Sequence, residues 1–86
     1  MRDYNPIVTA AKHVNTYVLD HLDKSDPTPE FSVYVVWFCY ILGGWKCLVS
    51  TTLPDGMYYE VTYDNYNSSI YLDAYKKFDN VEILVD

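Results

Sequence analysis

The sequence has few cysteines and few glycines, and each shortage excludes a class of functional site. Of its 86 residues only Cys39 and Cys47 are cysteines, and they form neither a CxxC redox motif nor a zinc-binding set. The strand pairing argued below places them on opposite faces of one hairpin, where a disulfide is geometrically unfavourable. With three glycines, the chain has no glycine-rich loop before a helix to hold a phosphate. We therefore expect two free thiols, a reducing compartment and no cofactor.

Basic residues are also scarce. Six Lys and Arg residues against twelve Asp and Glu residues give a formal net charge of −6. This charge repels the phosphate backbone of nucleic acids and anionic membrane surfaces, so we expect no direct nucleic-acid partner and no membrane partner. Two interpretations stay open. The acidic surface either serves solubility alone or attracts a basic protein, such as one that normally holds DNA or RNA.

Long apolar runs are missing as well. The chain opens MRDYNPIV, without the ordered regions of a signal peptide, and its longest apolar run is too short and too strand-like to span a bilayer. These features predict a soluble, cytoplasmic protein. Half of the residues are hydrophobic and 17% are aromatic, which is enough for one modest core. We therefore expect a single domain over residues 1–86, which an oligomer or a bound partner would stabilise further.

An amphipathic helix is predicted over residues 6–23. Asn5 followed by Pro6 is typical of a helix start, because Asn accepts from free backbone N–H groups and Pro fits the first turn. Pro27 and Pro29 prevent the helix from continuing, so residues 24–31 are predicted to form an extended linker. The apolar stripe of the helix, at steps of three and four, is Ile7, Ala10, Ala11, Val14, Tyr17, Val18 and Leu22.

The rest of the chain predicts an antiparallel meander. Gly43 and Gly44 form the first two-residue turn, and the segments LPDGM and NYNSS form the next two. Residues 81–85 are either a short fifth strand or a loose tail. The fold class is therefore α+β, with the helix packed on a four- or five-stranded sheet. The predicted strands, rich in β-branched and aromatic residues, are about 32–42, 45–53, 57–64 and 70–77.

Turn geometry predicts a register and therefore a core face. With Gly43 and Gly44 as the whole first loop, Tyr40 faces Cys47, and the Pro-Asp-Gly loop then places Val49 opposite Val61. The face predicted to lie under the helix consists of Tyr34, Val36, Phe38, Tyr40, Leu42, Trp45, Cys47, Val49, Thr51, Leu53, Met57, Tyr59, Val61, Ile70, Leu72 and Ala74.

The opposite face is apolar along the first two predicted strands. An apolar row at a sheet edge invites aggregation, so we expect it to be covered. The cover is either intramolecular, by residues 81–85 or the proline linker, or intermolecular, by a homodimer or a target. A register slip of one residue is the third explanation. The predicted partner or oligomer interface is Val35, Trp37, Cys39, Ile41 and Leu48, with Val33 in the same row.

No catalytic or metal-binding constellation stands out. His13 and His21 lie eight residues apart, too far for two imidazoles on one helix to share a metal. Glu60 and Asp73 share a flat face without an evident pocket, so they are not expected to act as an acid–base pair. We expect no catalytic residue, no metal and no enzyme activity. The polar half of this face is instead a predicted binding face of Tyr58, Glu60, Tyr71, Asp73 and Tyr75.

One long stretch resembles a family of small uncharacterised phage and prophage proteins of Gram-positive bacteria. The matching segments are VYVVWFCYILGGWKCLVSTTLPDGMYYEVTY and IYLDAYKKFDN, within residues 33–80. They are similar to the family pattern VYVVWF, W-K-A-L-x-S-T-T, D-G-x-Y-Y-E-V-T-Y and I-Y-L-D-x-Y-K. The resemblance implies a phage origin and the cytoplasm of a bacterial host, and it carries over no catalytic residue.

The leading hypothesis is a small acidic phage accessory protein that acts by protein binding. Its partner would be a host or defence factor, and inhibition of a bacterial CRISPR complex is one example. Two alternatives stay open: a homo-oligomeric structural or interaction protein, such as a homodimer joined through the apolar row, and a binder of a small ligand or nucleotide signal that stacks on the tyrosines. Ten tyrosines are also ordinary strand formers, so their number alone decides nothing.

Overall fold

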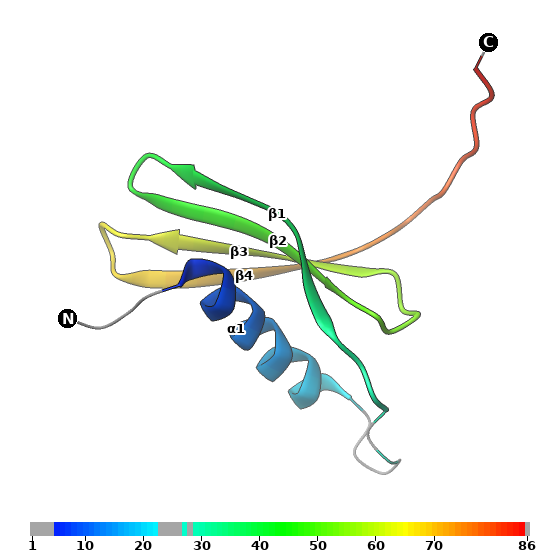
Figure 1. The fold of residues 1–86 in the computed structure, drawn as a ribbon, viewed down its shortest axis with the longest axis horizontal. Helices are drawn as coiled ribbons and strands as arrows, with labels where there is room; N and C mark the ends of the chain where they lie inside the picture. Colours follow the sequence, from blue (N-terminus) through cyan, green and yellow to red (C-terminus); the bar gives the residue numbers. More distant parts are fainter. Residues whose placement is uncertain (1–4, 23–26, 28, 86) are drawn as a thin grey trace.

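One helix is followed by four strands in an antiparallel sheet of order β1-β2-β3-β4, as Figure 1 shows. The computed structural model describes residues 5–22, 27 and 29–85. The helix packs on one face of the sheet, so the predicted α+β class is confirmed. The elements are α1 (Pro6–His21), β1 (Val33–Ile41), β2 (Gly44–Thr51), β3 (Met57–Asp64) and β4 (Ser69–Lys76).

Helix α1 begins as the sequence predicts. Asn5 has an extended backbone, and its side-chain Oδ1 accepts from the backbone N–H groups of Ile7 and Val8 at 3.0 and 3.3 Å. The helix ends at His21, two residues before the predicted end, because Leu22 adopts an extended backbone (φ −77°, ψ 151°). Residues 23–26 and 28 of the predicted helix end and linker lie outside the described residues. No helix in the described ranges is long and apolar enough to cross a membrane.

The first turn lies one residue earlier than predicted. Leu42 and Gly43 form it, and only Gly43 needs the left-handed backbone (φ +83°). Gly44 belongs to β2 and pairs with Ile41, and its α-carbon lies so close to the Tyr63 carbonyl that an added Cβ would collide with that oxygen. Tyr40 therefore faces Trp45 instead of the predicted Cys47. The predicted placement of Leu42 in the core is wrong, because this turn residue is 96% exposed.

The strand pairing in the second hairpin also differs from the predicted register by two residues. Val49 faces Tyr59 instead of the predicted Val61. The cause is a longer connection, in which side chains hold the chain ends: Thr51 Oγ1 accepts from the N–H of Leu53 at 3.2 Å, and Asp55 Oδ1 accepts from the N–H of Met57 at 3.0 Å. A shift of two residues preserves the face of every side chain, so the predicted core faces of β2 and β3 remain valid.

A β-bulge in β1 changes the faces of its first residues. The ladder pairs Val35 with Val49 and Trp37 with Leu48, which leaves Val36 as the extra residue. Val33 and Val35 therefore lie on the helix-covered face, partly buried against the core. Tyr34 and Val36 are 47% and 46% exposed. The predictions that Tyr34 and Val36 belong to the core, and that Val33 and Val35 belong to the outer row, are wrong for this reason.

The core lies between α1 and the middle of the sheet. Its fully buried side chains include Val14 from the helix and Cys47, Val49 and Val61 from β2 and β3. Cys39 is exposed, so the two thiols do lie on opposite faces as predicted. Strand β4 lies at the margin of this core, where Ala74 is exposed despite its predicted core position. In the part of the chain that the structure describes, the buried apolar residues are Ala10, Val14, Val18, Trp45, Cys47, Val49, Tyr59 and Val61.

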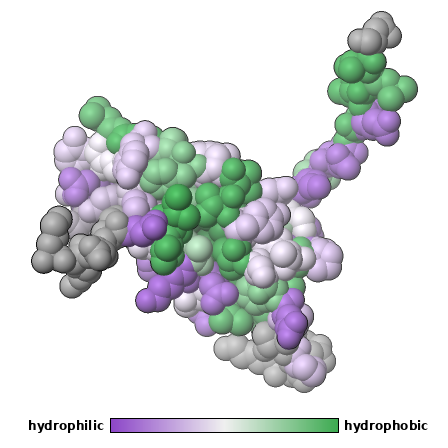
Figure 2. Space-filling model, viewed as in Figure 1, coloured by the Kyte–Doolittle hydropathy of each residue, from purple (hydrophilic) through white to green (hydrophobic). Residues whose placement is uncertain are grey.

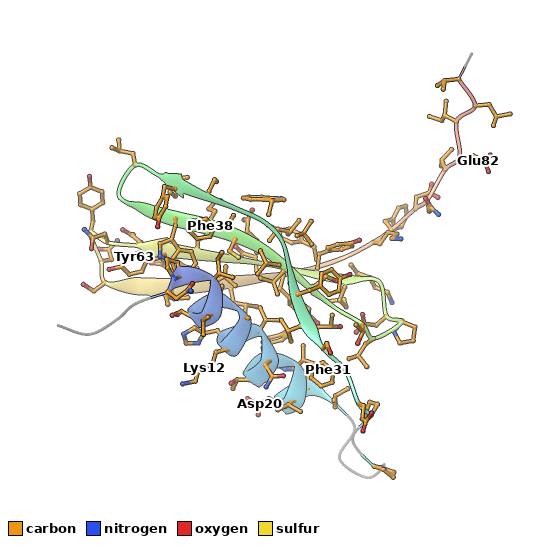
Figure 3. All side chains as sticks on the ribbon, viewed as in Figure 1. Lys12, Asp20, Phe31, Phe38, Tyr63 and Glu82 are labelled. Carbon is orange, nitrogen blue, oxygen red and sulfur yellow. The ribbon has the colours of Figure 1, made fainter. Side chains whose placement is uncertain are left out.

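The C-terminal tail, residues 78–85, leaves the sheet after β4 and extends away from the body (Figure 1). It forms no strand, so of the two predicted alternatives the structure shows a tail. Val81 and Ile83 are 67% and 77% exposed. Figure 3 labels Glu82 in this segment, well separated from the helix. The tail therefore does not cover the first strand of its own sheet.

Candidate functional site: the open face of the sheet

Helix α1 covers one face of the sheet, and the other face, here called the open face, points away from the core. Alternation along each strand and the ladder pairing together decide which side chains lie on it. Four rows of residues cross it from β1 to β4. They are Tyr34, Ser50, Tyr58 and Tyr75; Trp37, Leu48, Glu60 and Asp73; Cys39, Lys46, Thr62 and Tyr71; and Ile41, Gly44, Asp64 and Ser69.

The β1–β2 side of the open face carries a group of apolar side chains. Trp37, Cys39, Ile41 and Leu48, here called the apolar half, lie there together. Trp37 and Ile41 are 41% and 38% exposed, and Leu48 is partly buried between its neighbours. Four of the five predicted interface residues therefore share one surface. Val35 does not, because the bulge turns it toward the helix.

The β3–β4 side of the open face is acidic and rich in tyrosine. Glu60 lies directly opposite Asp73, and Tyr58 lies opposite Tyr75. Lys46 Nζ lies 3.3 Å from Glu60 Oε1, so one of the two carboxylates has a cationic partner. Tyr71 lies four residues from Tyr75 along β4, beyond the carboxylate row. The structure therefore brings two of the three predicted tyrosines together and separates the third from them by negative charge.

His21 makes its contacts within α1. The Nδ1 of His21 donates to the carbonyl of Tyr17 at 2.8 Å, and the two rings stack with centroids 4.0 Å apart. Within residues 5–22, 27 and 29–85, no three His, Cys, Asp or Glu side chains gather in a group that could hold a metal ion.

Two titratable groups of the described residues have shifted pKa values, and both belong to the core. Burial raises the pKa of the Cys47 thiol above its ordinary value. Burial also raises the pKa of Tyr59, and the negative charge of Asp55 and the nearby Tyr17 act in the same direction. These raised pKa values favour the neutral forms of the Cys47 thiol and the Tyr59 phenol. Cys47 is therefore a poor nucleophile, since the thiolate is the reactive form.

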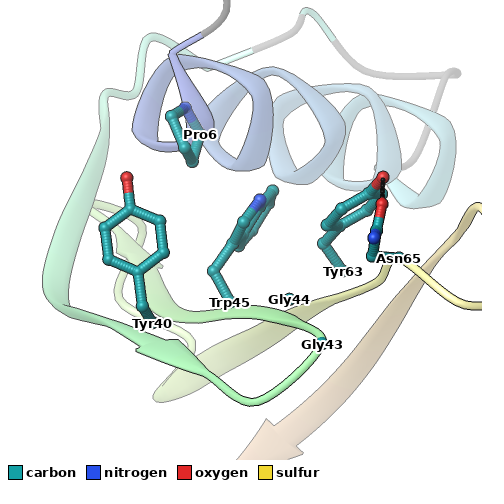
Figure 4. Close-up of a pocket in the computed structure, with 7 residues that line it drawn as sticks. All are labelled: Pro6, Tyr40, Gly43, Gly44, Trp45, Tyr63 and Asn65. Atoms are coloured by element: carbon teal, nitrogen blue, oxygen red, sulfur yellow. Dashed lines mark hydrogen bonds between the residues drawn. The ribbon is translucent and has the colours of Figure 1, made fainter.

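An aromatic pocket of about 340 Å³ lies at the turn end of the sheet, below the first residue of α1 (Figure 4). Tyr40, Trp45 and Tyr63 stand side by side in it, and Tyr63 Oη donates to Asn65 Oδ1 at 2.9 Å. The Nε1 of Trp45 is buried and has no hydrogen-bond partner among the described residues. Sequence reasoning missed this pocket because Tyr40 and Trp45 are direct partners only in the observed register. The pocket suits an uncharged ring.

A second apolar hollow, here called the edge groove, lies between α1 and the free edge of β1. Its volume is about 660 Å³. Ile7 and Val8 of the helix are 43% and 61% exposed beside it. Figure 2 shows hydrophobic residues gathered over α1 and the adjoining part of β1, and again along the tail. The lining residues are Ile7, Val8, Ala11, Lys12, Asn15, Val33 and Val35.

These observations define a class of structure: a four-stranded antiparallel meander that is backed by one helix and leaves one face uncovered by it. The chain belongs to the family of unknown function DUF6275, whose model matches residues 7–85. The match includes α1 almost entirely, all four strands and the tail. No curated protein and no solved structure matches the chain.

Proposed function

We propose that this protein is a small, non-enzymatic binding module that docks the open face of its sheet on a protein partner. The observation that carries the proposal is the exposed apolar half beside the edge of the sheet. Exposing the apolar half, which includes Trp37 and Ile41, to water costs free energy. Tryptophan is also prominent among residues that anchor protein interfaces. The flat face also suits a macromolecule better than a small ligand.

The chemistry of the open face describes the partner. Its apolar half would meet an apolar patch, and its acidic half, with Glu60 and Asp73, would meet basic side chains beside that patch. The net charge of −6 would increase the rate of encounter with such a basic surface. Basic surfaces of this kind occur on proteins that hold DNA or RNA.

A narrower form of the proposal places the protein in the cytoplasm of a bacterial host and takes a bacterial defence factor, such as a CRISPR complex, as the partner. It draws support from the acidic charge and from the resemblance of the strand segments to phage and prophage proteins. In this role the open face would block a cleft that normally binds nucleic acid.

The apolar half also supports a second candidate function, a homo-oligomeric interaction protein joined through Trp37, Cys39, Ile41 and Leu48. The small-ligand alternative has weaker support, because Glu60 and Asp73 separate Tyr71 from the other two tyrosines and repel the phosphates of a nucleotide.

Affinity capture with matched variants tests the proposal. The protein is used as bait in host lysate, alongside Trp37→Glu and the control Tyr66→Glu, which makes the same change at an exposed aromatic in the β3–β4 turn. The wild type and Tyr66→Glu should retain the same partner, and Trp37→Glu should lose it while keeping its circular dichroism spectrum. Equal retention by all three proteins would contradict docking through the open face.

A further inference from the structure

Within the tail, residues 81–85 carry apolar side chains on both alternating rows: Val81, Ile83 and Val85 on one, and Leu84 beside Glu82 on the other. Leu84 and Val85 are 85% and 88% exposed, and Val81 and Ile83 are nearly as open. Glu82 is the one charged residue in residues 81–85. An extended, apolar and unpaired segment of this kind is a ready β-strand donor, because pairing buries its side chains and satisfies its backbone groups together.

The edge groove has the complementary properties. Strand β1 is at the end of the strand order, so β2 pairs with only one of its two edges. Beside its first half lie the apolar groups of Ile7 and Val8, and on its other side Tyr34 and Val36 are about half exposed. Among the described residues, Lys12 is the only charged one that lines the groove. A strand laid along this edge would therefore meet apolar surface on both faces and a cation on one.

We propose that residues 81–85 of one copy pair with the edge of β1 of a second copy, and that the exchange is reciprocal. Glu82 and Leu84 face α1 of the partner copy, where Lys12 meets the carboxylate and the leucine enters the edge groove. Val81, Ile83 and Val85 then lie beside Tyr34 and Val36. The charges agree with this occupant: the groove carries one positive residue in a chain of net charge −6, and residues 81–85 carry one negative residue.

The fold also explains why the second copy is the favoured partner. The tail leaves from β4, at the opposite end of the strand order from β1, and runs away from the body. A two-fold exchange uses both tails and both edges, so the assembly closes at two chains. The bulge at Val36 interrupts the regular ladder of β1, and an irregular edge of this kind disfavours further addition of strands. The matched family region includes this tail through residue 85.

The test is the concentration dependence of mass, measured by light scattering and sedimentation on full chains. The wild type should dimerise. Leu84→Glu should weaken the dimer on the order of a hundredfold, since each of two sites loses a buried leucine worth at least about tenfold. The matched control Leu42→Glu, at a leucine that is 96% exposed in the first turn, should leave dimerisation unchanged. A monomeric wild type, or a dimer that Leu84→Glu does not weaken, would overturn the proposal.

A charge exchange tests the register and the exchange between chains. Lys12→Glu and Glu82→Lys each place like charges in both sites of a homodimer, so each should dimerise about tenfold more weakly than the wild type. A mixture of the two variants restores opposite charges at both sites, and its heterodimer should regain the wild-type affinity. If the mixture shows no such recovery, the tail does not occupy the partner's groove in this way.

This inference goes beyond the proposed function, because it uses the edge of β1 and the edge groove instead of the apolar half. Failure of the tail exchange and failure of open-face docking give different experimental results. Loss of the dimer in Leu84→Glu with partner capture intact leaves open-face docking in place. A dimer that is broken by Trp37→Glu and not by Leu84→Glu would instead favour self-association through the open face.

Discussion

At the scale of single residues, the two cysteines differ most in their surroundings. Cys39 is exposed on the open face, and Cys47 is fully buried, with a raised pKa. One thiol per chain should therefore react with Ellman's reagent in the native protein, and two should react in the denatured protein. Cys39→Ser should react only after denaturation. Rapid reaction of both thiols in the native state would show that the core between α1 and β2 is open.

The perturbed groups also predict how stability depends on pH. Folding raises the pKa values of Cys47 and Tyr59 above their ordinary values of 9.0 and 10.0. Their contribution is fully present below those ordinary values and is lost as the pH rises through the raised ones. The free energy of unfolding should therefore fall as the pH increases above about 9. Denaturant titrations over this range measure it, and Tyr59→Phe should show a smaller fall above pH 10, because it keeps the ring without the phenol. If the free energy of unfolding of Tyr59→Phe falls with pH as steeply as that of the wild type, Tyr59 does not contribute to the fall.

At the scale of elements, the bulge in β1 decides which side chains of this strand meet the helix. Val35 is partly buried against the core and Val36 is 46% exposed. Val35→Ala should lower the free energy of unfolding by about 1–2 kcal/mol, whereas Val36→Ala should change it by less than about 0.5 kcal/mol. Chemical denaturation of both variants in the Leu84→Glu background, which removes the proposed dimer, measures the difference. The opposite order would mean that β1 runs without the bulge.

The carboxylate pair on β3 and β4 predicts a variant that gains stability. Glu60 and Asp73 are directly opposed, and Lys46 compensates only Glu60. Asp73→Asn removes the like charge and should raise the free energy of unfolding by about 0.2–1 kcal/mol. It should also weaken capture of a basic partner, because it removes negative charge from the open face. Denaturant midpoints test the first effect, and a lower midpoint for Asp73→Asn would contradict it.

The elements also show why some predictions succeed from sequence. Asn5 and Pro6 act locally, so the helix start follows from residue chemistry alone. The faces of β2 and β3 follow from strict alternation, which a shift of two residues does not change. The bulge depends on how β1 fits between α1 and β2, and no residue near Val36 announces it. The glycine pair is ambiguous for a related reason, because Gly43 serves the turn and Gly44 serves the close approach to Tyr63.

At the scale of the whole molecule, the sheet is asymmetric: α1 packs on one face and leaves the other uncovered by the helix. The apolar half is largely predictable, since Trp37, Cys39 and Ile41 alternate along one strand. The edge groove and the aromatic pocket are not, because the groove depends on the bulge that turns Val33 and Val35 toward α1, and the pocket depends on the register that pairs Tyr40 with Trp45. The position of the tail likewise depends on a competition between intramolecular and intermolecular pairing that the sequence does not decide.

The most direct test of docking through the open face is the accessibility of Trp37. The chain has two tryptophans, and Trp45 is 3% exposed, so Trp45→Phe leaves Trp37 as the single tryptophan while keeping a ring in the core. Acrylamide should quench Trp37 readily in the free variant, and the captured partner should reduce the quenching constant severalfold. A Trp37 that is quenched equally in the free and bound states would contradict the account.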